Sequence, residues 1–414
     1  MRILIAANVP KRREGGAAGI AYGVGRGLEQ LGHSVEYLFA GDLPETSYLP
    51  GRFDDMGFAI KLARFIRRDP GRFSVVNIHA PGGCVYGPLH RILPGTRKNG
   101  PAYVMTLHGL EERRIYGMGR EAKKGKAFHF DFKNRLWHRL YHLPRFYLSI
   151  KTADHAICYG RDTWTVLQLK YNLDPDQVSY VPNGVEERFF IPREYSHAPS
   201  ARLLYAGTWL DQRGIFYIRD ALRSLSRRLP GLRLTIAGCG SDAEQVRNFF
   251  DSDLRPFVDV ISMVPADQMP ALFAQNDIFV FPSIMEGTPL ALQEAMASGI
   301  AVVTTETCGM IDLVEHEFNG LLVPPADSAA LENAIWRLSQ EADLRAKLGR
   351  AAQETMRRFT WARTVRGVES ACASALRRAG READLLDELS AQRPEATTAD
   401  PEAVGNARAI ARKS

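Results

Sequence analysis

Two glutamates, Glu286 and Glu294, stand eight residues apart in the sequence. We expect Glu286 in a loop and Glu294 in the helix that follows this loop. The first turn of a helix has unpaired N–H groups and a partial positive charge, so it attracts phosphate. Carboxylates in the loop and inside the helix can accept hydrogen bonds from sugar hydroxyls on either side of that anion, each worth about 1.5–3 kcal/mol. A nucleotide diphosphate sugar has this layout. A bare pair at this spacing is more often solvated surface, so the surrounding residues decide.

The elements around the two glutamates follow from apolar runs and helix end signals. An apolar run over 277–281 predicts a strand, and a second run over 301–305 predicts another. Between them Thr288 suits the N-cap, Pro289 suits the first helical position and Gly299 suits the residue after the last turn. We expect Glu294 about two turns into this helix. The order of strand, loop, helix and strand builds parallel sheets.

The same stretch resembles the signature of retaining glycosyltransferases with the GT-B fold, in particular family 4. That signature reads Glu-Gly, two residues, Leu, three residues, Glu-Ala-Met-Ala, one residue, Gly. The matching residues are Glu286, Gly287, Leu290, Glu294, Ala295, Met296, Ala297 and Gly299. The resemblance implies an α/β fold of two Rossmann-like parallel-sheet domains that face a central cleft, with a C-terminal helix that crosses back to the N-terminal domain.

The resemblance also implies an activity. The chain would move a hexose from a nucleotide diphosphate sugar to a glycan or lipid-linked acceptor, with retention, in the synthesis of cell-surface polysaccharide or glycolipid. The donor phosphate would accept the proton of the acceptor. Glu294 would hold the ribose, and Glu286 would hold the hydroxyls of the sugar, helped by backbone N–H groups between Gly287 and Leu290. We therefore assign Gly287, Thr288, Pro289, Leu290 and Glu294 to donor binding.

A phosphate clamp is expected after the first strand of the C-terminal domain. The family pattern is Gly-Arg-Leu, four residues, then Lys-Gly. Here Gly207 is followed by Thr208, and Arg213 stands at the Lys position. Guanidinium grips phosphate through a fork of donors, so Arg213 is a plausible substitute. Thr208 removes one expected positive charge; its hydroxyl hydrogen-bonds a phosphate instead, or another cation supplies the charge. Gly238 opens a Gly-x-Gly that we expect to line the nucleotide cleft.

The N-terminal half begins with a strand–helix–strand pattern. Gly15 and Gly16 lie at its first turn, where glycine lets a backbone N–H approach a phosphate. By resemblance Gly16 contacts the donor diphosphate. His108 ends a later strand, where open α/β sheets place ligands. It is either a structural hydrogen-bonding residue or a contact of the transferred sugar; on the second reading it joins Glu286 and Arg213 as a catalytic residue.

Length and composition fit this plan. A chain of 414 residues suffices for two domains, and we place them at 1–190, with the crossover helix 360–380, and at 200–358. The tail 381–414 has few large apolar residues and is expected to be mobile. The apolar runs of this chain are much shorter than the ~20 residues that a helix needs to span a bilayer. Five scattered cysteines predict free thiols and a cytoplasmic location.

Positive charge is concentrated in the first half of the chain. The net charge of +6 divides into +10 for residues 1–190 (28 Lys/Arg, 18 Asp/Glu) and −4 for the rest (25 and 29). The segment 120–151 has nine Lys/Arg and two Asp/Glu, interleaved with aromatic residues. It is either a helix with solvated basic residues or an element that contacts anionic lipid or a phosphate-bearing acceptor at the inner face of a membrane, at about 1 kcal/mol per basic residue. Nucleic-acid modules are not recognised, so nucleic acid is not an expected partner.

Two other classes remain. A nicotinamide-dependent oxidoreductase needs Gly-x-Gly-x-x-Gly in its first strand–helix turn, where this chain has only Gly15 and Gly16. A non-catalytic membrane scaffold derived from a transferase would not need the intact glutamate pair. For the transferase we expect neither a cofactor nor a metal, since helix N-termini and Arg213 neutralise the diphosphate.

Overall fold

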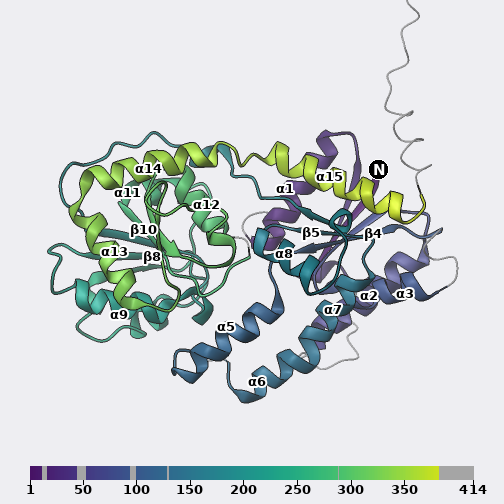
Figure 1. Ribbon diagram of the computed structural model, residues 1–414, viewed down its shortest axis with the longest axis horizontal. Helices are drawn as coiled ribbons and strands as arrows, with labels where there is room; N and C mark the ends of the chain where they lie inside the picture. The colour runs from purple at the N-terminus through teal and green to yellow at the C-terminus, as the bar shows by residue number, and fades with distance from the viewer. Residues whose placement is uncertain (12–15, 44–52, 94–98, 128–129, 288, 382–414) are drawn as a thin grey trace, which may run out of the picture.

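The structure is a computed structural model that describes residues 1–11, 16–43, 53–93, 99–127, 130–287 and 289–381, arranged as two lobes (Figure 1). The first lobe is built on a six-stranded sheet in the order β2-β1-β3-β4-β5-β6, whose neighbours pair in parallel. Its strands are β1 (Arg2–Ala7), β2 (Ser34–Phe39), β3 (Val75–His79), β4 (Ala102–Leu107), β5 (His155–Cys158) and β6 (Val178–Tyr180).

The second lobe repeats this architecture with a six-stranded parallel sheet in the order β12-β11-β10-β7-β8-β9. Its strands are β7 (Arg202–Ala206), β8 (Arg233–Ala237), β9 (Val258–Ile261), β10 (Ile278–Phe281), β11 (Ala301–Thr305) and β12 (Leu321–Val323). The strand order reverses between β7 and β10. Ligands of open α/β sheets bind at the carboxyl ends of strands beside such a reversal.

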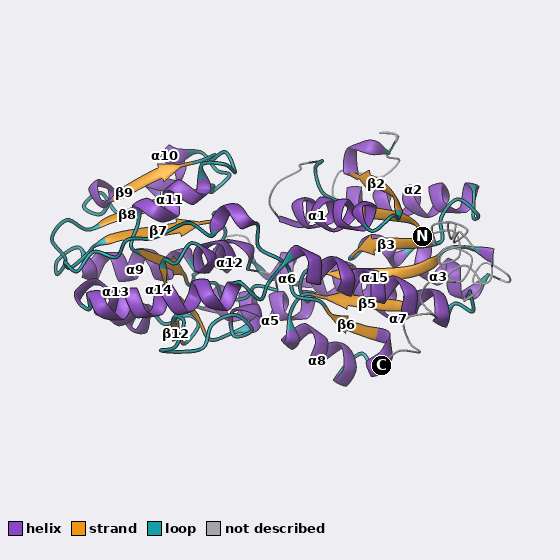
Figure 2. Ribbon diagram, turned by 90° about the horizontal axis from the view of Figure 1, so that it is seen from above, coloured by secondary structure: helices purple, strands orange, loops and turns teal. Residues whose placement is uncertain are grey.

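Helices cover both faces of each sheet (Figure 2), which explains why β3, β4, β10 and β11 are buried along their whole length. The N-terminal lobe has α1 (Gly16–Gln30), α2 (Asp54–Arg68), α3 (Tyr86–Ile92), α5 (Glu111–Lys123), α6 (Phe132–Trp137), α7 (Leu143–Thr152) and α8 (Arg161–Leu169). The C-terminal lobe has α9 (Ile215–Leu225), α10 (Ala243–Asn248), α11 (Met269–Gln275), α12 (Leu290–Ala297), α13 (Ser328–Gln340) and α14 (Ala342–Met356).

The last described helix, α15 (Trp361–Arg378), returns to the N-terminal lobe, as predicted. The hydroxyl of Thr360 caps its first turn, and Val368, Ala371 and Cys372 are buried in the core between α1 and the first sheet. The connecting segment 191–200 contains neither helix nor strand. The domain boundaries drawn from the sequence remain a prediction, and the tail beyond residue 381 lies outside the described residues.

An insertion between β4 and β5 lies below the two lobes in Figure 1. It consists of α5, α6, a π-helical turn η4 (His138–His142) and α7. Pro144 lies in the first turn of α7, where no N–H is needed, so the helix continues to Thr152. Within the described part of the chain, helices long and apolar enough to cross a membrane do not occur.

Candidate active site

The signature loop runs from the end of β10 to α12. Pro289, with φ −82° and ψ 72°, is the N-cap, so α12 begins at Leu290, one residue later than predicted. Glu294 is therefore the fifth residue of the helix, little more than one turn from its start. The prediction that Glu294 lies about two turns into the helix is wrong. The predicted N-cap, Thr288, lies outside the described residues. Gly299 has φ +71° and follows the last turn, as predicted.

Glu286 in this loop forms an ion pair with Arg213. Arg213 ends a short 3-10 turn (Asp211–Arg213) after β7, and its guanidinium lies over the ring of Phe281, 5.4 Å from the centroid. Both side chains are largely buried, and burial lowers the pKa of Arg213 below its usual value. The predicted phosphate-binding cation is thus held against the predicted sugar-binding carboxylate.

Glycine permits the close packing of the Arg213 turn on the signature loop. Gly214 has φ +74°, and a Cβ there would lie 2.0 Å from the carbonyl oxygen of Pro282. The loop is further fixed by the Ile284 N–H, which donates to the Gln212 carbonyl at 2.8 Å. Residues 212–214 and 282–286 therefore form one unit, although some 70 residues separate them in the sequence.

Gly287 brings the two lobes into backbone contact. A Cβ on Gly287 would lie 1.9 Å from the carbonyl oxygen of His108, in the loop after β4. The loop after β5 also approaches the signature loop, because a Cβ on Gly160 would lie 3.2 Å from the Gly287 carbonyl oxygen. Beside it the Arg161 N–H donates to the Asp312 carboxylate at 2.7 Å. The structure thus places His108 next to the signature loop.

The His108 ring is buried among other rings. Its Nε2 lies 2.9 Å from Nδ1 of His79, and it stacks on Tyr159 with centroids 5.4 Å apart. Burial lowers the pKa of His108 to about 4. The imidazole is therefore neutral at pH 7 and one nitrogen is engaged with His79. This geometry accommodates both readings of His108, and its contact with the sugar stays a prediction.

The carboxyl group of Glu294 is desolvated. Burial, reinforced by the negative charge of Glu186 and partly offset by Arg188, raises the pKa of Glu294 to about 8. The side chain is therefore mainly protonated at neutral pH. A protonated carboxyl both donates and accepts a hydrogen bond, which matches a ribose hydroxyl. Glu186 and Arg188 were missed in the sequence because they lie about 100 residues before Glu294.

The other predicted donor-binding residues lie at the carboxyl ends of strands. Gly207 and Thr208 follow β7, and Gly238 follows β8. These two loops are joined, since the Trp209 N–H donates to the Cys239 carbonyl at 3.0 Å. Thr208 is exposed and its carbonyl accepts from the Tyr205 hydroxyl. In the other lobe Gly16 is exposed at the first position of α1, while Gly15 lies outside the described residues.

A cavity of about 820 Å³ opens beside the signature loop, between α5 and the loops after β7 and β8. Its volume falls in the ~300–1,000 Å³ range typical of small-molecule sites. The lining residues include Arg114, Met118, Trp209, Gln212, Asp242 and Phe249. Sequence reasoning missed all of these. Glu286, Glu294 and His108 are not among the lining residues, so the cavity flanks the predicted centre.

An expectation that the chain has no Asp-x-Asp triplet to hold a metal on a diphosphate is wrong: the sequence contains two such triplets, and their four aspartates are exposed. Asp174 and Asp176 contact Arg378. Asp251 is paired with Arg223 on α9, and Asp253 is exposed.

Comparison with known proteins agrees with this architecture. A model of glycosyltransferase family 4 matches residues 14–189, and a model of glycosyl transferases group 1 matches residues 188–355. Sucrose-phosphate synthase from Thermosynechococcus elongatus has a TM-score of 0.68 at 18% identity and covers 94% of this chain and 100% of its own. HepE of Anabaena, in complex with UDP and glucose, has a TM-score of 0.64 at 16% identity, with 90% and 100% covered.

Relatives of similar sequence are glycosyltransferases by name. The amylovoran biosynthesis glycosyltransferase AmsK of Erwinia amylovora is 33% identical over 179 residues, 41% of this chain and 44% of that protein. The UDP-Gal:alpha-D-GlcNAc-diphosphoundecaprenol alpha-1,3-galactosyltransferase of Escherichia coli is 22% identical over 299 residues, 69% of this chain and 71% of that protein. The match therefore spans less than half of AmsK and most of the Escherichia coli enzyme.

Two lobes, each built on a parallel six-stranded sheet and in contact through the loop that precedes α12, define the GT-B class. The chain belongs to the GT-B glycosyltransferases, with a family 4 N-terminal region and a group 1 C-terminal region. The alternative of a nicotinamide-dependent oxidoreductase has no support in these matches.

Proposed function

We propose that this protein transfers a hexose from a nucleotide diphosphate sugar to a glycan or lipid-linked acceptor, with retention of configuration. The observation that carries the proposal is the Glu286–Arg213 pair at the start of α12, where a cation, a carboxylate and helix N–H groups converge. Relatives that act on lipid-linked glycans, such as the diphosphoundecaprenol galactosyltransferase, support a lipid-linked acceptor in polysaccharide or glycolipid synthesis.

Binding of the donor requires an exchange of partners. The diphosphate lies at the N-terminus of α12 and takes the guanidinium of Arg213 from Glu286. Glu286 is then released to accept hydrogen bonds from the sugar hydroxyls, while Glu294 binds the ribose. Arg213 and the helix N-terminus neutralise the developing charge on the leaving diphosphate without a metal there. The donor phosphate accepts the acceptor's proton on the face from which it departs.

Calorimetry with nucleotide diphosphates tests this proposal. UDP, GDP and ADP are first screened for an increase in melting temperature, since a ligand of the folded state stabilises it. The best of them is then titrated into the wild type and Glu294→Ala. Loss of hydrogen bonds to the ribose should weaken binding about 10- to 100-fold. Unchanged affinity in Glu294→Ala would remove this residue from the site. Exposed Glu315→Ala on the same lobe is the matched control.

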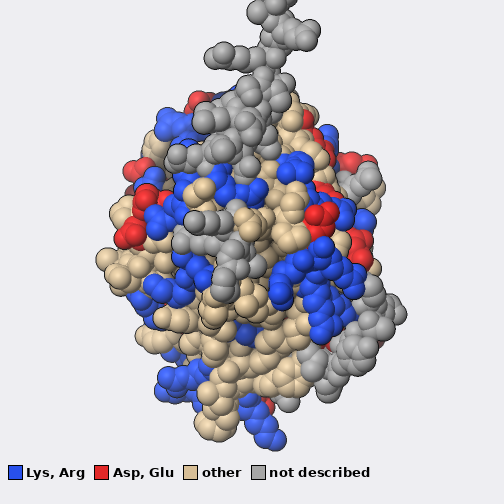
Figure 3. Space-filling model, turned by 90° about the vertical axis from the view of Figure 1, so that its right-hand side faces the viewer, with Lys and Arg blue, Asp and Glu red and all other residues tan. Residues whose placement is uncertain are grey.

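The insertion offers a surface for an anionic membrane. Large apolar side chains are exposed there, with Tyr116 66%, Phe132 70% and Leu140 70% accessible. Tyr116 and Phe132 line a groove of about 560 Å³, together with the basic residues Arg120, Lys123, Arg135, Arg139 and Lys170. The end of the N-terminal lobe shows more Lys and Arg than Asp and Glu (Figure 3). Apolar side chains among basic ones match the boundary between headgroups and acyl chains.

This surface holds the protein at the inner face of the membrane, close to a lipid-linked acceptor. Sedimentation with vesicles of phosphatidylcholine, with or without phosphatidylglycerol, tests the idea at physiological salt. The triple variant Arg120→Ala, Lys123→Ala, Arg139→Ala should lose about 100-fold in partitioning, at about 1 kcal/mol per residue. The double variant Arg247→Ala, Lys347→Ala changes exposed charges of the other lobe and should bind as the wild type does. Absence of wild-type binding to anionic vesicles refutes the membrane surface.

A further inference from the structure

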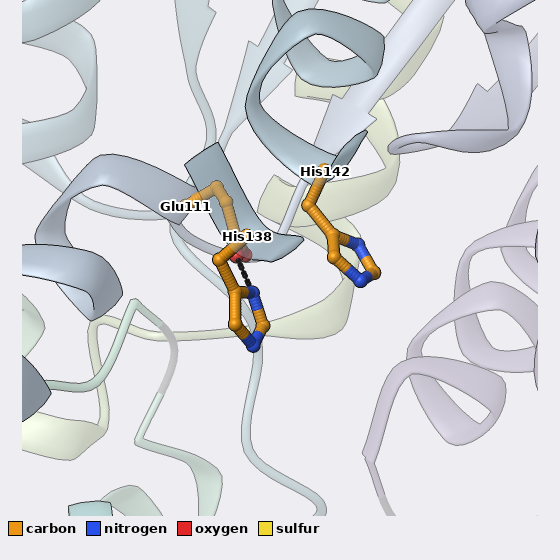
Figure 4. Close-up of side chains that lie close together, drawn as sticks. All are labelled: Glu111, His138 and His142. Atoms are coloured by element: carbon orange, nitrogen blue, oxygen red, sulfur yellow. Dashed lines mark hydrogen bonds and ion pairs between the residues drawn. The ribbon is translucent and has the colours of Figure 1, made fainter. Parts of the chain in front are cut away.

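Three potential metal ligands converge inside the insertion, apart from the residues assigned to donor binding. Glu111 opens α5, and His138 and His142 begin and end the π-helical turn η4. One donor atom from each of the three lies within 4.8 Å of the other two. Figure 4 shows both imidazole rings projecting from the same helical segment, with the Glu111 carboxylate meeting the ring of His138.

The surroundings hold this arrangement in place. Nδ1 of His138 is hydrogen-bonded to the Glu111 carboxylate, which is 7% exposed. The rings of His138 and His142 are stacked, with centroids 4.7 Å apart and 26° between their planes. Phe130 packs on His138 at 5.2 Å, and Trp137 lies edge-on to His142. Two stacked imidazoles beside one buried carboxylate repel each other when both are protonated, whereas a cation between them satisfies all three groups.

We propose that Glu111, His138 and His142 bind one divalent transition-metal ion, with Zn²⁺ as the best match. Imidazole nitrogen and carboxylate oxygen are the ligands that Zn²⁺ takes at about 2.0–2.2 Å, so tetrahedral donors lie roughly 3.4 Å apart. The donor atoms already lie within 4.8 Å of one another, so small side-chain shifts bring them to that distance. Two histidines four residues apart on one helix face a common ligand. A water oxygen completes the tetrahedron.

The ion links the start of α5 to η4. Glu111 lies three residues after His108, so the ion holds the end of the His108 loop against the insertion. π-helical turns are rare and occur often at functional sites. The presence of such a turn between His138 and His142 therefore fits a metal site. The ligands all come from the N-terminal lobe, so this site is separate from the metal-free neutralisation proposed for the donor diphosphate. It does not depend on the proposed transfer activity.

Metal analysis of the whole chain tests the site. Protein stripped with EDTA and dialysed is titrated with Zn²⁺ alone by calorimetry, and the visible spectrum is recorded with Co²⁺. The wild type should bind one equivalent and give the strong bands of tetrahedral Co²⁺. His138→Gln with His142→Gln should weaken Zn²⁺ binding at least about 10-fold and abolish those bands. The single variant His142→Gln keeps the His138–Glu111 contact and provides the test if the double variant does not fold.

His197→Gln is the matched control, because this histidine is 89% exposed in the segment that connects the two lobes. It should retain wild-type affinity and stoichiometry. Equal Zn²⁺ affinity in the wild type and the His138/His142 variants overturns the proposal and leaves these residues as a hydrogen-bonded cluster that needs no metal. Wild-type binding without tetrahedral Co²⁺ bands also overturns it.

Discussion

Glu294 should make the stability of the protein depend on pH in an unusual direction. Burial raises its pKa from 4.5 to about 8 in the folded chain. Between these two values the folded state retains a proton that the unfolded state has released. The free energy of unfolding therefore decreases as pH rises through this window. At about 1.4 kcal/mol per pKa unit, the full shift corresponds to about 5 kcal/mol.

The substitution Glu294→Gln isolates this contribution. Glutamine has nearly the size of a protonated glutamate but does not ionise, so the variant lacks this pH dependence. The free energy of unfolding of the variant, relative to the wild type, should increase by about 4 kcal/mol between roughly pH 5 and pH 8.5. The gap should widen by about 1.4 kcal/mol per pH unit and level off above about pH 8.

Urea unfolding followed by tryptophan fluorescence at half-unit pH steps measures this gap. Glu315→Gln, an exposed carboxylate on the same lobe, should run parallel to the wild type at every pH. A constant difference between Glu294→Gln and the wild type would refute the reasoning, because Glu294 would then ionise alike in the folded and unfolded chains.

Three further predictions follow from single contacts. Arg213→Ala removes the phosphate fork, so affinity for the nucleotide diphosphate should decrease about 10- to 100-fold by calorimetry, and unchanged affinity would contradict the partner exchange. Gly287→Ala adds a Cβ 1.9 Å from the His108 carbonyl oxygen, so transfer turnover should decrease more than about 10-fold while circular dichroism keeps the native spectrum; wild-type turnover would show that the lobes do not need this contact. Lys126→Ala breaks the 2.7 Å ion pair that links the turn after α5 to Asp220 on α9, which should lower the free energy of urea unfolding by about 0.2–1 kcal/mol at low salt and by less at high salt. An equal loss at both salt concentrations would indicate lost packing.

The sequence predicted features that depend on local pattern. The spacing of Phe58, Leu62, Phe65 and Ile66 within 54–68 predicts a helix that packs by one face. The helix α2 spans these residues; Phe58, Leu62 and Ile66 are buried and Phe65 is half-buried. The order of runs around the signature predicts β10, α12 and β11. Local patterns carry this information because a helix or strand in a layered α/β fold shows its buried face as a period in the chain.

Features that depend on contacts between distant residues were not predictable in this way. The Arg213–Glu286 pair joins two loops of the C-terminal lobe that lie some 70 residues apart in the sequence. Gly287 approaches His108 where the two lobes meet, and the sequence shows no partner for either contact. The start of α12 moved by one residue because Pro289 takes the N-cap conformation. The proposed metal ligands were not predicted from the sequence. His138 and His142 stand four residues apart in the chain, but Glu111 lies beside them only because η4 packs against α5.

The placement of α15 has a consequence for biosynthesis. Its buried face, with Val365, Val368 and Leu376, completes the core that α1 and β1 begin. During synthesis the sheet of the first lobe is made some 180 residues before this helix. The apolar surface that α15 covers is therefore exposed to solvent until those residues have been made. The group 1 lobe, whose own core includes α13 and α14, is complete before that surface is covered, and the lobe translated first is therefore the last to finish folding.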